Sequence, residues 1–358
     1  MQICLTLVCI STANGLVAPS VRMSASAATP KRVLFLFSDT GGGHRASALA
    51  LRDALEASYP GRIECDLVDL FVEAGRLPFC EYPTIYKQVP GSHSPHRHLT
   101  AASTSPHLLT FDPPQLAENP WSWKAVFDFG DSLFGIWFNE LFTTFVCYDD
   151  FRRLLKKPPK PDLVVSVHPL LQATPLKALA SLDGGTRTTP FVTVVTDLGS
   201  ASAQWFDKRV DKCYVPSAAL RSLAQRRELR DEQIAQYGLP IRRGFWQGGS
   251  DGVGGGDKDE TRKALGLKTS MPTVLVVGGG DGMGGLSATA SAIGEGLGSN
   301  AGESQLVVVC GRNEAAVAEL GAQAWPSNVR AEILGFVNNM DQVRSNSRVW
   351  GLFGGPPV

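Results

Sequence analysis

The chain has 358 residues, of which 43% are hydrophobic and 19% are charged, so it holds enough apolar material for two globular domains of ordinary size. Its 34 basic and 34 acidic residues cancel, so no chain-wide positive field favours nucleic acid as a partner. The seven cysteines are scattered without a Cys-x-x-Cys pair, which is typical of buried thiols in a reducing compartment and argues against a disulfide framework.

The N-terminal segment differs in composition from the rest. Residues 3–11 (ICLTLVCIS) are apolar but too short to span a bilayer, and a Ser- and Ala-rich basic stretch follows with no acidic residue before Asp39. A secretory signal followed by an organelle transit peptide has this order, although a positively charged start is missing. We expect residues 1–30 to be a bipartite leader for import into a plastid; a disordered tail is the alternative.

Eight short apolar runs alternate with helical stretches along the rest of the chain. They lie at 32–37, 63–70, 162–168, 191–197, 212–217, 273–279, 306–311 and 330–336. Near-continuous apolar strands that alternate with helices are typical of parallel sheets covered on both faces. The sequence therefore predicts an α/β fold.

Two glycine loops follow predicted strands and precede predicted helices, at 38–47 (SDTGGGHRAS) and at 278–285 (GGGDGMGG). The unpaired N–H groups of a helix N-terminus bind a phosphate or a developing oxyanion, and glycines let the ligand approach closely. A dinucleotide site is one interpretation, with Asp66 or Asp69 on the ribose. His44 and Arg45 argue against it, because a dinucleotide fold places small residues there.

Three side chains are candidates for proton transfer. His44 opens a predicted helix, where an imidazolium is disfavoured, so a neutral ring there is suited to act as a general base; capping of the helix is the alternative. His168 and Asp197 follow two predicted strands, at the sheet edge where sites of open α/β folds gather. His168 also fits a buried core histidine, and Asp197 could orient a hydroxyl or cap a turn.

An aromatic stripe and a basic segment follow one another in the middle of the chain. The stripe has helical spacing and comprises Phe134, Trp137, Phe138, Leu141, Phe142 and Phe145. The basic segment comprises Arg152, Arg153, Lys156, Lys157 and Lys160. The pair could dock the protein on an anionic lipid surface; a core helix with a solvated end is the alternative.

Residues 89–116 contain four of the six histidines amid Ser, Thr and Pro. His93, His96 and His98 could be imagined as metal ligands, but this composition is typical of a disordered insertion. We expect no metal site and no cofactor.

Several motifs in order between residues 32 and 340 resemble the monogalactosyldiacylglycerol synthases, the plastid enzymes that make the main galactolipid. They are SDTGGGHRASALALRDAL, PDLVVSVHPLLQ, VTDLGS, YGLPIRRGF, VLVVGGGDGMGGL, VVVCGRN and LGFVNNM. The resemblance implies a GT-B fold of two Rossmann-like domains and an inverting enzyme that acts at a membrane surface. It also implies transfer of galactose from UDP-galactose to diacylglycerol, with no nucleic-acid partner.

The resemblance also assigns residues. His44 matches the catalytic base. An acceptor-side loop, near which the family engages anionic lipid, comprises Asp39, Thr40, Gly41, Gly42, Gly43 and Pro78. The donor-binding set comprises Gly278, Gly279, Gly280, Asp281, Gly282, Met283, Gly284, Phe336 and Val337. The family's histidine shortly after VTDL is absent here.

We expect an N-terminal domain over 31–244 interrupted by the insertion 89–116, a linker over 245–270, a partial donor domain over 271–340 with three strands, and a tail over 341–358 outside the family pattern. With the later family positions missing, this chain should bind donor poorly and turn over little. A non-catalytic membrane-binding protein, a transferase with another UDP-sugar or lipid acceptor, and a dinucleotide oxidoreductase are the alternatives.

Overall fold

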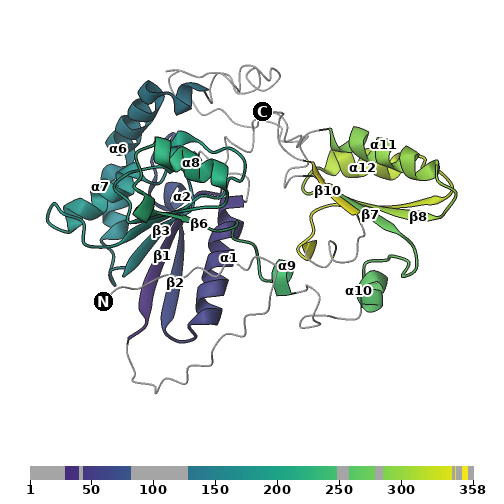
Figure 1. Ribbon diagram of the computed structural model, residues 1–358, viewed down its shortest axis with the longest axis horizontal. Coiled ribbons are helices and arrows are strands. Elements are labelled where there is room, and N and C mark those ends of the chain that lie inside the picture. Colours follow the sequence, from purple (N-terminus) through teal and green to yellow (C-terminus); the bar gives the residue numbers. More distant parts are fainter. Residues whose placement is uncertain are drawn as a thin grey trace, which may run out of the picture. The chain divides into compact units, whose positions relative to one another are not determined.

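The structure is a computed structural model that describes residues 29–39, 43–81, 128–247, 258–278, 285–340, 343 and 349–353. Contacts between residues divide the described chain into a first unit that ends at Arg243 and a second unit that begins at Gly244. Each unit contains one parallel sheet with helices against it (Figure 1).

The first unit has six parallel strands in the order β2-β1-β3-β4-β5-β6. The strands are β1 (Lys31–Phe37), β2 (Ile63–Asp69), β3 (Leu163–Ser166), β4 (Phe191–Val194), β5 (Lys212–Val215) and β6 (Ile234–Gln236). The helices are α1 (Gly43–Ser58), α2 (Leu70–Ala74), α6 (Leu133–Leu155), α7 (Ala173–Leu182) and α8 (Ala218–Arg226), with short 3₁₀ turns η1 (Phe79–Glu81), η2 (Ala203–Trp205) and η3 (Asp231–Gln233).

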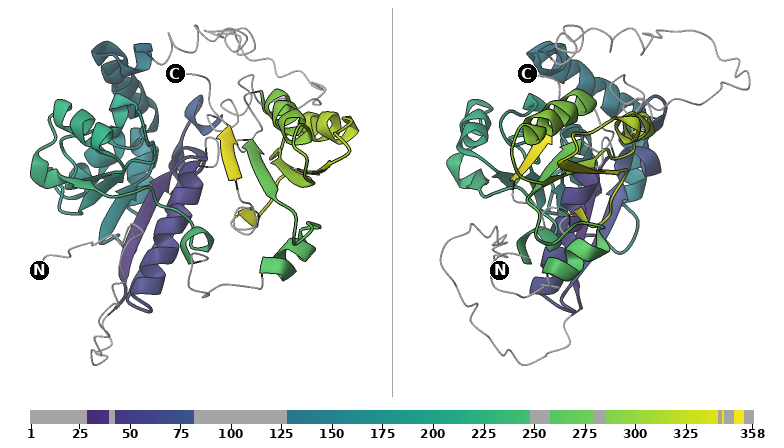
Figure 2. Two further views of the ribbon diagram at one scale, coloured as in Figure 1. Left: turned by 45° about the vertical axis from the view of Figure 1, so that its right-hand side comes forward. Right: turned by 90° about the vertical axis from the view of Figure 1, so that its right-hand side faces the viewer.

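Alternation along the strands divides the apolar side chains of this unit between two cores. Leu34 and Leu36 of β1 join a core that includes residues of α2, α6, α7 and α8, whereas Val33, Phe35 and Phe37 join a second core with α1. Successive residues of a strand point to opposite faces, so one apolar strand supplies both cores. Figure 2 shows α1 along one side of the sheet.

The second unit has four parallel strands in the order β10-β7-β8-β9. Its elements are α9 (Gly244–Gln247), α10 (Lys258–Ala264), β7 (Thr273–Gly278), α11 (Leu286–Gly298), β8 (Ser304–Val309), α12 (Glu314–Ala322), β9 (Val329–Leu334) and β10 (Val349–Phe353). Residues of α11 and α12 share one core with Val276, and Leu267 packs with Leu275 in the other.

The eight strands that the sequence predicts are present, and the α/β fold class is confirmed. Within the predicted bounds 271–340 the second unit has the three strands β7, β8 and β9, and a fourth strand that was not predicted, β10, follows them and pairs with β7 in parallel. The glycine in its short sequence, VWGLF, weakens a strand pattern. The prediction of a linker over 245–270 was wrong for its C-terminal part, which contains the helix α10. Arg262 of α10 is buried and donates from Nη2 to Thr273 Oγ1 at 2.7 Å.

The leader prediction lies almost entirely, and the insertion 89–116 entirely, outside the described residues. Of the described residues, no helix is long and apolar enough to cross a membrane.

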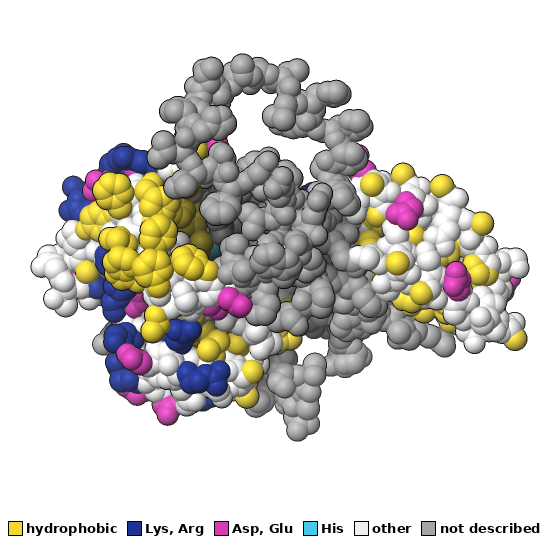
Figure 3. Space-filling view, turned by 90° about the horizontal axis from the view of Figure 1, so that it is seen from above, with side chains coloured by type: hydrophobic (Ala, Val, Ile, Leu, Met, Phe, Trp, Pro, Cys, Tyr) yellow, Lys and Arg dark blue, Asp and Glu magenta, His cyan; other side chains and the backbone are white. Residues whose placement is uncertain are grey.

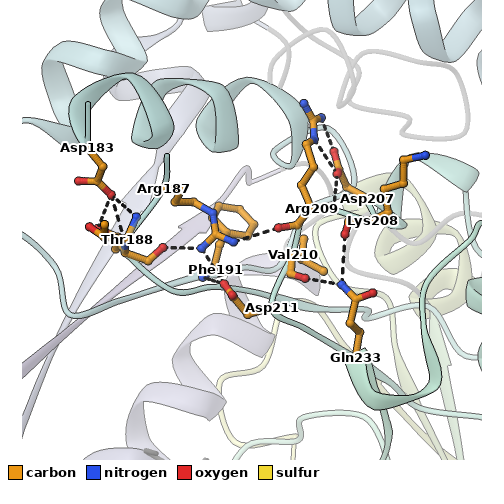
Figure 4. Close-up of polar contacts among 11 residues, drawn as sticks. Asp183, Arg187, Thr188, Phe191, Asp207, Lys208, Arg209, Val210, Asp211 and Gln233 are labelled. Atoms are coloured by element: carbon orange, nitrogen blue, oxygen red, sulfur yellow. Dashed lines mark hydrogen bonds and ion pairs between the residues drawn. The ribbon is translucent and has the colours of Figure 1, made fainter. Parts of the chain in front are cut away.

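Polar side chains tie together the loops at the amino ends of β4 and β5 (Figure 4). The Arg187 guanidinium donates to the Asp211 carboxylate at 2.6 Å and to the Arg209 carbonyl at 2.9 Å. The Asp183 carboxylate accepts hydrogen bonds from the backbone N–H groups of Thr188 (2.7 Å) and Thr189 (3.1 Å). These contacts lie where the two strands begin, and we assign them to stability.

Asp183→Asn is expected to destabilise the first unit by about 1–2 kcal/mol at pH 7, because an ionised acceptor makes stronger hydrogen bonds than an amide. Hydrogen bonds from Lys160, Thr188 and Thr189 hold the pKa of Asp183 well below its ordinary value. Its contribution is therefore complete above about pH 4 and is lost as pH falls towards the folded-state pKa. Urea unfolding should show the difference between wild type and variant narrowing below about pH 4. Asp231→Asn, at an exposed ion pair with Arg221, is the control and should change little.

Candidate active site

The candidate site lies at the carboxyl edge of the first sheet. Asp39 follows β1, Val167 and His168 follow β3, and Thr196 and Asp197 follow β4. Because these strands are parallel neighbours, their carboxyl ends meet at one edge. His44, the second residue of α1, reaches this edge from the helix N-terminus.

The His44 ring is enclosed by side chains from three segments. Its Nδ1 lies 3.2 Å from the hydroxyl oxygen of Thr196. Its ring centroid lies 4.6 Å from that of His168 and 5.9 Å from that of Trp205. The ring also makes a hydrogen bond to the backbone carbonyl of Val167.

Burial lowers the pKa of His44 below its ordinary value. The charge of Asp197, the Val167 carbonyl and the charge of Asp39 act in the opposite direction and offset part of this shift. The imidazole is therefore neutral at neutral pH, which a general base requires, and the charge of Asp197 favours the protonated ring once it takes a proton.

His168 lies beside His44 at the sheet edge, as its position after β3 predicts. It is also a buried residue whose ring and carbonyl make hydrogen bonds within the protein. Its Nδ1 accepts a hydrogen bond from the N–H of Leu170 at 3.3 Å, and its carbonyl accepts one from Gln172 at 3.0 Å. Burial and the neighbouring His44 lower the pKa of His168 well below its ordinary value. His168 is therefore a neutral wall of the site.

Asp197 is held by the indole of Trp205, whose Nε1–H donates to Oδ2 at 2.7 Å. Burial raises the pKa of Asp197, while the Trp205 hydrogen bond and the charge of His44 lower it. The carboxylate thus bonds a side chain eight residues away, and its charge acts on His44.

The first glycine loop is described only at its ends, because Thr40, Gly41 and Gly42 lie outside the described residues. The N–H of Asp39 donates to Asp69 Oδ2 at 2.9 Å, and Asp69 Oδ1 accepts from Val72 N at 3.2 Å at the start of α2. Asp66 pairs with Arg32. Both carboxylates that could hold a ribose in a dinucleotide site are thus engaged by the protein, which argues against that alternative.

Pro78 lies on a loop that packs against α6. The next residue, Phe79, is buried, and its ring lies 5.4 Å from that of Phe142. Leu77, the residue before Pro78, is exposed beside this contact. Pro78 and the aromatic helix therefore belong to one surface.

The aromatic stripe of α6 is not core, so the core part of that alternative was wrong. All its side chains are exposed, from 37% for Phe142 to 86% for Phe145. Figure 3 shows a broad cluster of hydrophobic side chains bordered by Lys and Arg. We call Leu77, Phe129, Leu133 and the six stripe residues the apolar face. In the basic segment, Arg153 pairs with Asp150, Lys160 pairs with Asp183 and Arg152 bonds Ser181.

The donor-binding candidates belong to the second unit. Gly278 ends β7 and Gly285, in a left-handed conformation at φ 63°, precedes α11. The six residues between them, Gly279, Gly280, Asp281, Gly282, Met283 and Gly284, lie outside the described residues. Phe336 and Val337 follow β9. The exposed Phe336 ring carries the Arg312 guanidinium 5.1 Å from its centroid, and Val337 packs against the core.

Sequence reasoning missed Thr196 and Trp205. Thr196 stands directly before Asp197 at the end of β4, so its position was a usable signal. Trp205 lies eight residues later in a 3₁₀ turn, where nothing in the local pattern pointed to Asp197. Within the described ranges, no cluster of three His, Cys, Asp or Glu side chains is arranged to hold a metal ion.

Comparison with known proteins shows similarity to one family of enzymes. Residues 122–241 match the family model described as monogalactosyldiacylglycerol (MGDG) synthase. "Monogalactosyldiacylglycerol synthase 1, chloroplastic" of Arabidopsis thaliana is 34% identical over 316 residues, which cover 87% of this chain and 52% of that protein. The enzyme of Spinacia oleracea is 34% identical over 317 residues, 88% of this chain and 54% of that protein. The chain thus spans about half the length of these relatives.

Two solved structures are similar at lower identity. MurG of Acinetobacter baumannii is 15% identical with a TM-score of 0.45, over 90% of this chain and 71% of that one. Anabaena HepE in complex with UDP-glucose is 15% identical with a TM-score of 0.40, over 89% of this chain and 72% of that one.

Proposed function

This chain is a relative of the monogalactosyldiacylglycerol synthases, and from that premise we propose that it transfers galactose from UDP-galactose to diacylglycerol. The observation that carries the proposal is His44, a neutral imidazole at the carboxyl edge of the first sheet beside the Asp197 carboxylate. We further propose that the two parallel-sheet units form a GT-B enzyme, with acceptor at the first unit and donor at the second.

In the proposed reaction His44 takes the proton of the free diacylglycerol hydroxyl. The hydroxyl oxygen forms a bond to C1 of galactose while the bond from C1 to the diphosphate oxygen breaks, and UDP leaves with the electron pair. Attack from the face opposite the leaving group converts the α-linked sugar into a β-galactoside. The N–H groups at the start of α11, behind the loop 278–285, are suited to stabilise the departing diphosphate.

We propose a plastid membrane as the place of action, since the relatives are named chloroplastic, with a leader in residues 1–30. The apolar face is proposed to contact the lipid surface, and nearby Lys and Arg to favour anionic lipid. Exposed aromatic side chains gathered on one helix are costly in water and gain free energy by entering the headgroup region.

Replacing Trp137 and Phe138 together by serine is expected to lower partitioning onto anionic phospholipid vesicles by roughly tenfold or more, because even partial burial of two aromatic rings contributes more than about 1.4 kcal/mol. Vesicle co-sedimentation measures the effect. Ile241→Ser removes a similarly exposed apolar side chain outside the apolar face and should leave partitioning unchanged. Equal binding of the double variant and wild type would contradict membrane contact through α6.

The function is tested by incubating the purified chain with radiolabelled UDP-galactose and diacylglycerol in these vesicles and looking for labelled galactolipid. Product that depends on both substrates supports the proposal, and parallel reactions with UDP-glucose test the sugar. Vesicle binding without any product would instead favour the second candidate, a non-catalytic membrane-binding protein, for which the apolar face is the supporting observation.

A further inference from the structure

The candidate site contains a tryptophan, a carboxylate and a histidine in series. We propose that Trp205 and Asp197 are positioning residues that hold a negative charge beside His44, so that the imidazole can accept and keep the acceptor's proton. This rests on the proposed galactosyl transfer for its catalytic meaning, but the arrangement itself can be tested without turnover.

Trp205 is buried and holds the Asp197 carboxylate through one hydrogen bond. Among the described residues, its side chain is the largest that is fully buried. It lies in the turn η2, where the Ser202 hydroxyl and the Ala203 N–H both donate to the Asp131 carboxylate. An indole has one donor, and here that donor is given to Asp197 Oδ2 at 2.7 Å. A buried carboxylate needs such a donor to remain ionised. Trp205 thereby favours the charged form of Asp197.

Asp197 is the main counter-charge of His44. His168 after β3, Thr196 after β4 and Trp205 of η2 lie around the ring, and the charges of Asp39 after β1 and Asp197 after β4 act on it. Asp197 opposes the effect of burial on the pKa of His44 more strongly than Asp39 does. Arg45 Nη1 lies 3.7 Å from Asp39 Oδ2, so the Arg45 charge partly neutralises that carboxylate. An imidazolium formed during transfer would therefore be stabilised chiefly by Asp197.

Thr196 completes the arrangement from the same segment. Its hydroxyl contacts His44 Nδ1 at 3.2 Å, so the ring is fixed in rotation while the adjacent residue supplies the charge. Two consecutive residues at the end of β4 thus control the orientation and the protonation of His44. A purely structural role for Trp205, filling the core, would need no indole N–H and no ionised Asp197.

The test is the titration of His44 followed by NMR in the whole chain labelled at histidine carbons, with the signal assigned from a His44→Phe variant. Asp197→Asn keeps an oxygen acceptor for the indole but removes the charge, so the midpoint of the His44 titration should move to lower pH. Trp205→Phe keeps an aromatic ring but removes the N–H, and should move it in the same direction.

Two matched controls should leave the titration unchanged. Asp211→Asn removes a carboxylate at the amino end of β5, and Trp325→Phe removes an indole that donates to the Leu320 carbonyl in the second unit. An unchanged His44 midpoint in Asp197→Asn overturns the proposal. Since Asn closely matches Asp in size, this variant decides the matter even if Trp205→Phe does not fold.

Turnover gives the second readout. In vesicle assays Asp197→Asn should lower kcat at least about tenfold, with KM for diacylglycerol little changed, since the lost interaction concerns proton transfer. Absence of galactolipid from the wild type as well would count against the proposed function and would leave the NMR result standing. A shifted titration with an unchanged kcat would remove Asp197 and Trp205 from the catalytic machinery.

Discussion

His44→Ala is expected to lower kcat for the proposed galactolipid formation by roughly 10²- to 10⁴-fold, which is the usual contribution of a positioned general base. The reason is geometric: among the described side chains at this edge of the sheet, His44 is the one placed at a helix N-terminus beside the glycine loop, with Asp197 to stabilise the proton it takes. Initial rates in vesicles, at saturating UDP-galactose and diacylglycerol, measure the loss.

UDP binding should survive the same substitution, because the proposed donor residues belong to the second unit. Isothermal titration calorimetry with UDP therefore separates loss of the base from loss of donor binding. Arg52→Ala on the same helix is the matched control, since Arg52 forms an ion pair with its neighbour Asp53 and lies outside the candidate site. Retention of most of the turnover by His44→Ala would eliminate His44 as the base.

Phe71→Ala has the largest expected effect on stability, a loss of about 3–5 kcal/mol in the free energy of unfolding. Phe71 is fully buried under the site, and its ring lies 5.3 Å from that of Phe79, 6.0 Å from that of Phe151 and 6.1 Å from that of His168. Since domains are stable by only about 5–15 kcal/mol, the variant should unfold at far lower urea concentration.

Val72→Ala supplies the control for Phe71→Ala, because the next side chain along α2 is 56% exposed. Its effect should stay within about 0.5 kcal/mol, as for most surface substitutions. A loss of less than about 1 kcal/mol for Phe71→Ala would mean that the contacts among α2, η1 and α6 contribute little to the stability of the first unit.

Strong apolar runs made most of the fold predictable. Residues 32–37 and 191–197 could be recognised because parallel strands buried on both faces need uninterrupted apolar side chains. β6 is three residues long and β10 has a glycine at its centre, so neither carries enough pattern to be recognised alone. The packed part of the linker was missed because its anchor, Arg262, is buried through hydrogen bonds that a hydropathy pattern does not report.

The residues of the candidate site were predictable where they stand at the end of a strand or the start of a helix. They were not predictable where contacts between segments far apart in the sequence decide their surroundings. His44, His168 and Asp197 could be found because each follows a strand or opens a helix. That they meet follows from the strand order, which places β3 between β1 and β4. The exposure of the α6 aromatics could not be read from spacing, because a core stripe and a docking stripe have the same period.

The rings of His44 and His168, whose centroids lie 4.6 Å apart, limit how many protons the site can hold during the proposed reaction. A proton on His44 makes protonation of His168 harder still, so the pair carries one positive charge at most. His168 therefore does not offer a second place for the proton. In the proposed reaction, the proton taken from one lipid must reach bulk water, directly or with the departing product, before the next transfer can begin. Proton exit thus becomes a step that can limit the rate, and kcat should respond to D₂O more strongly than substrate binding does.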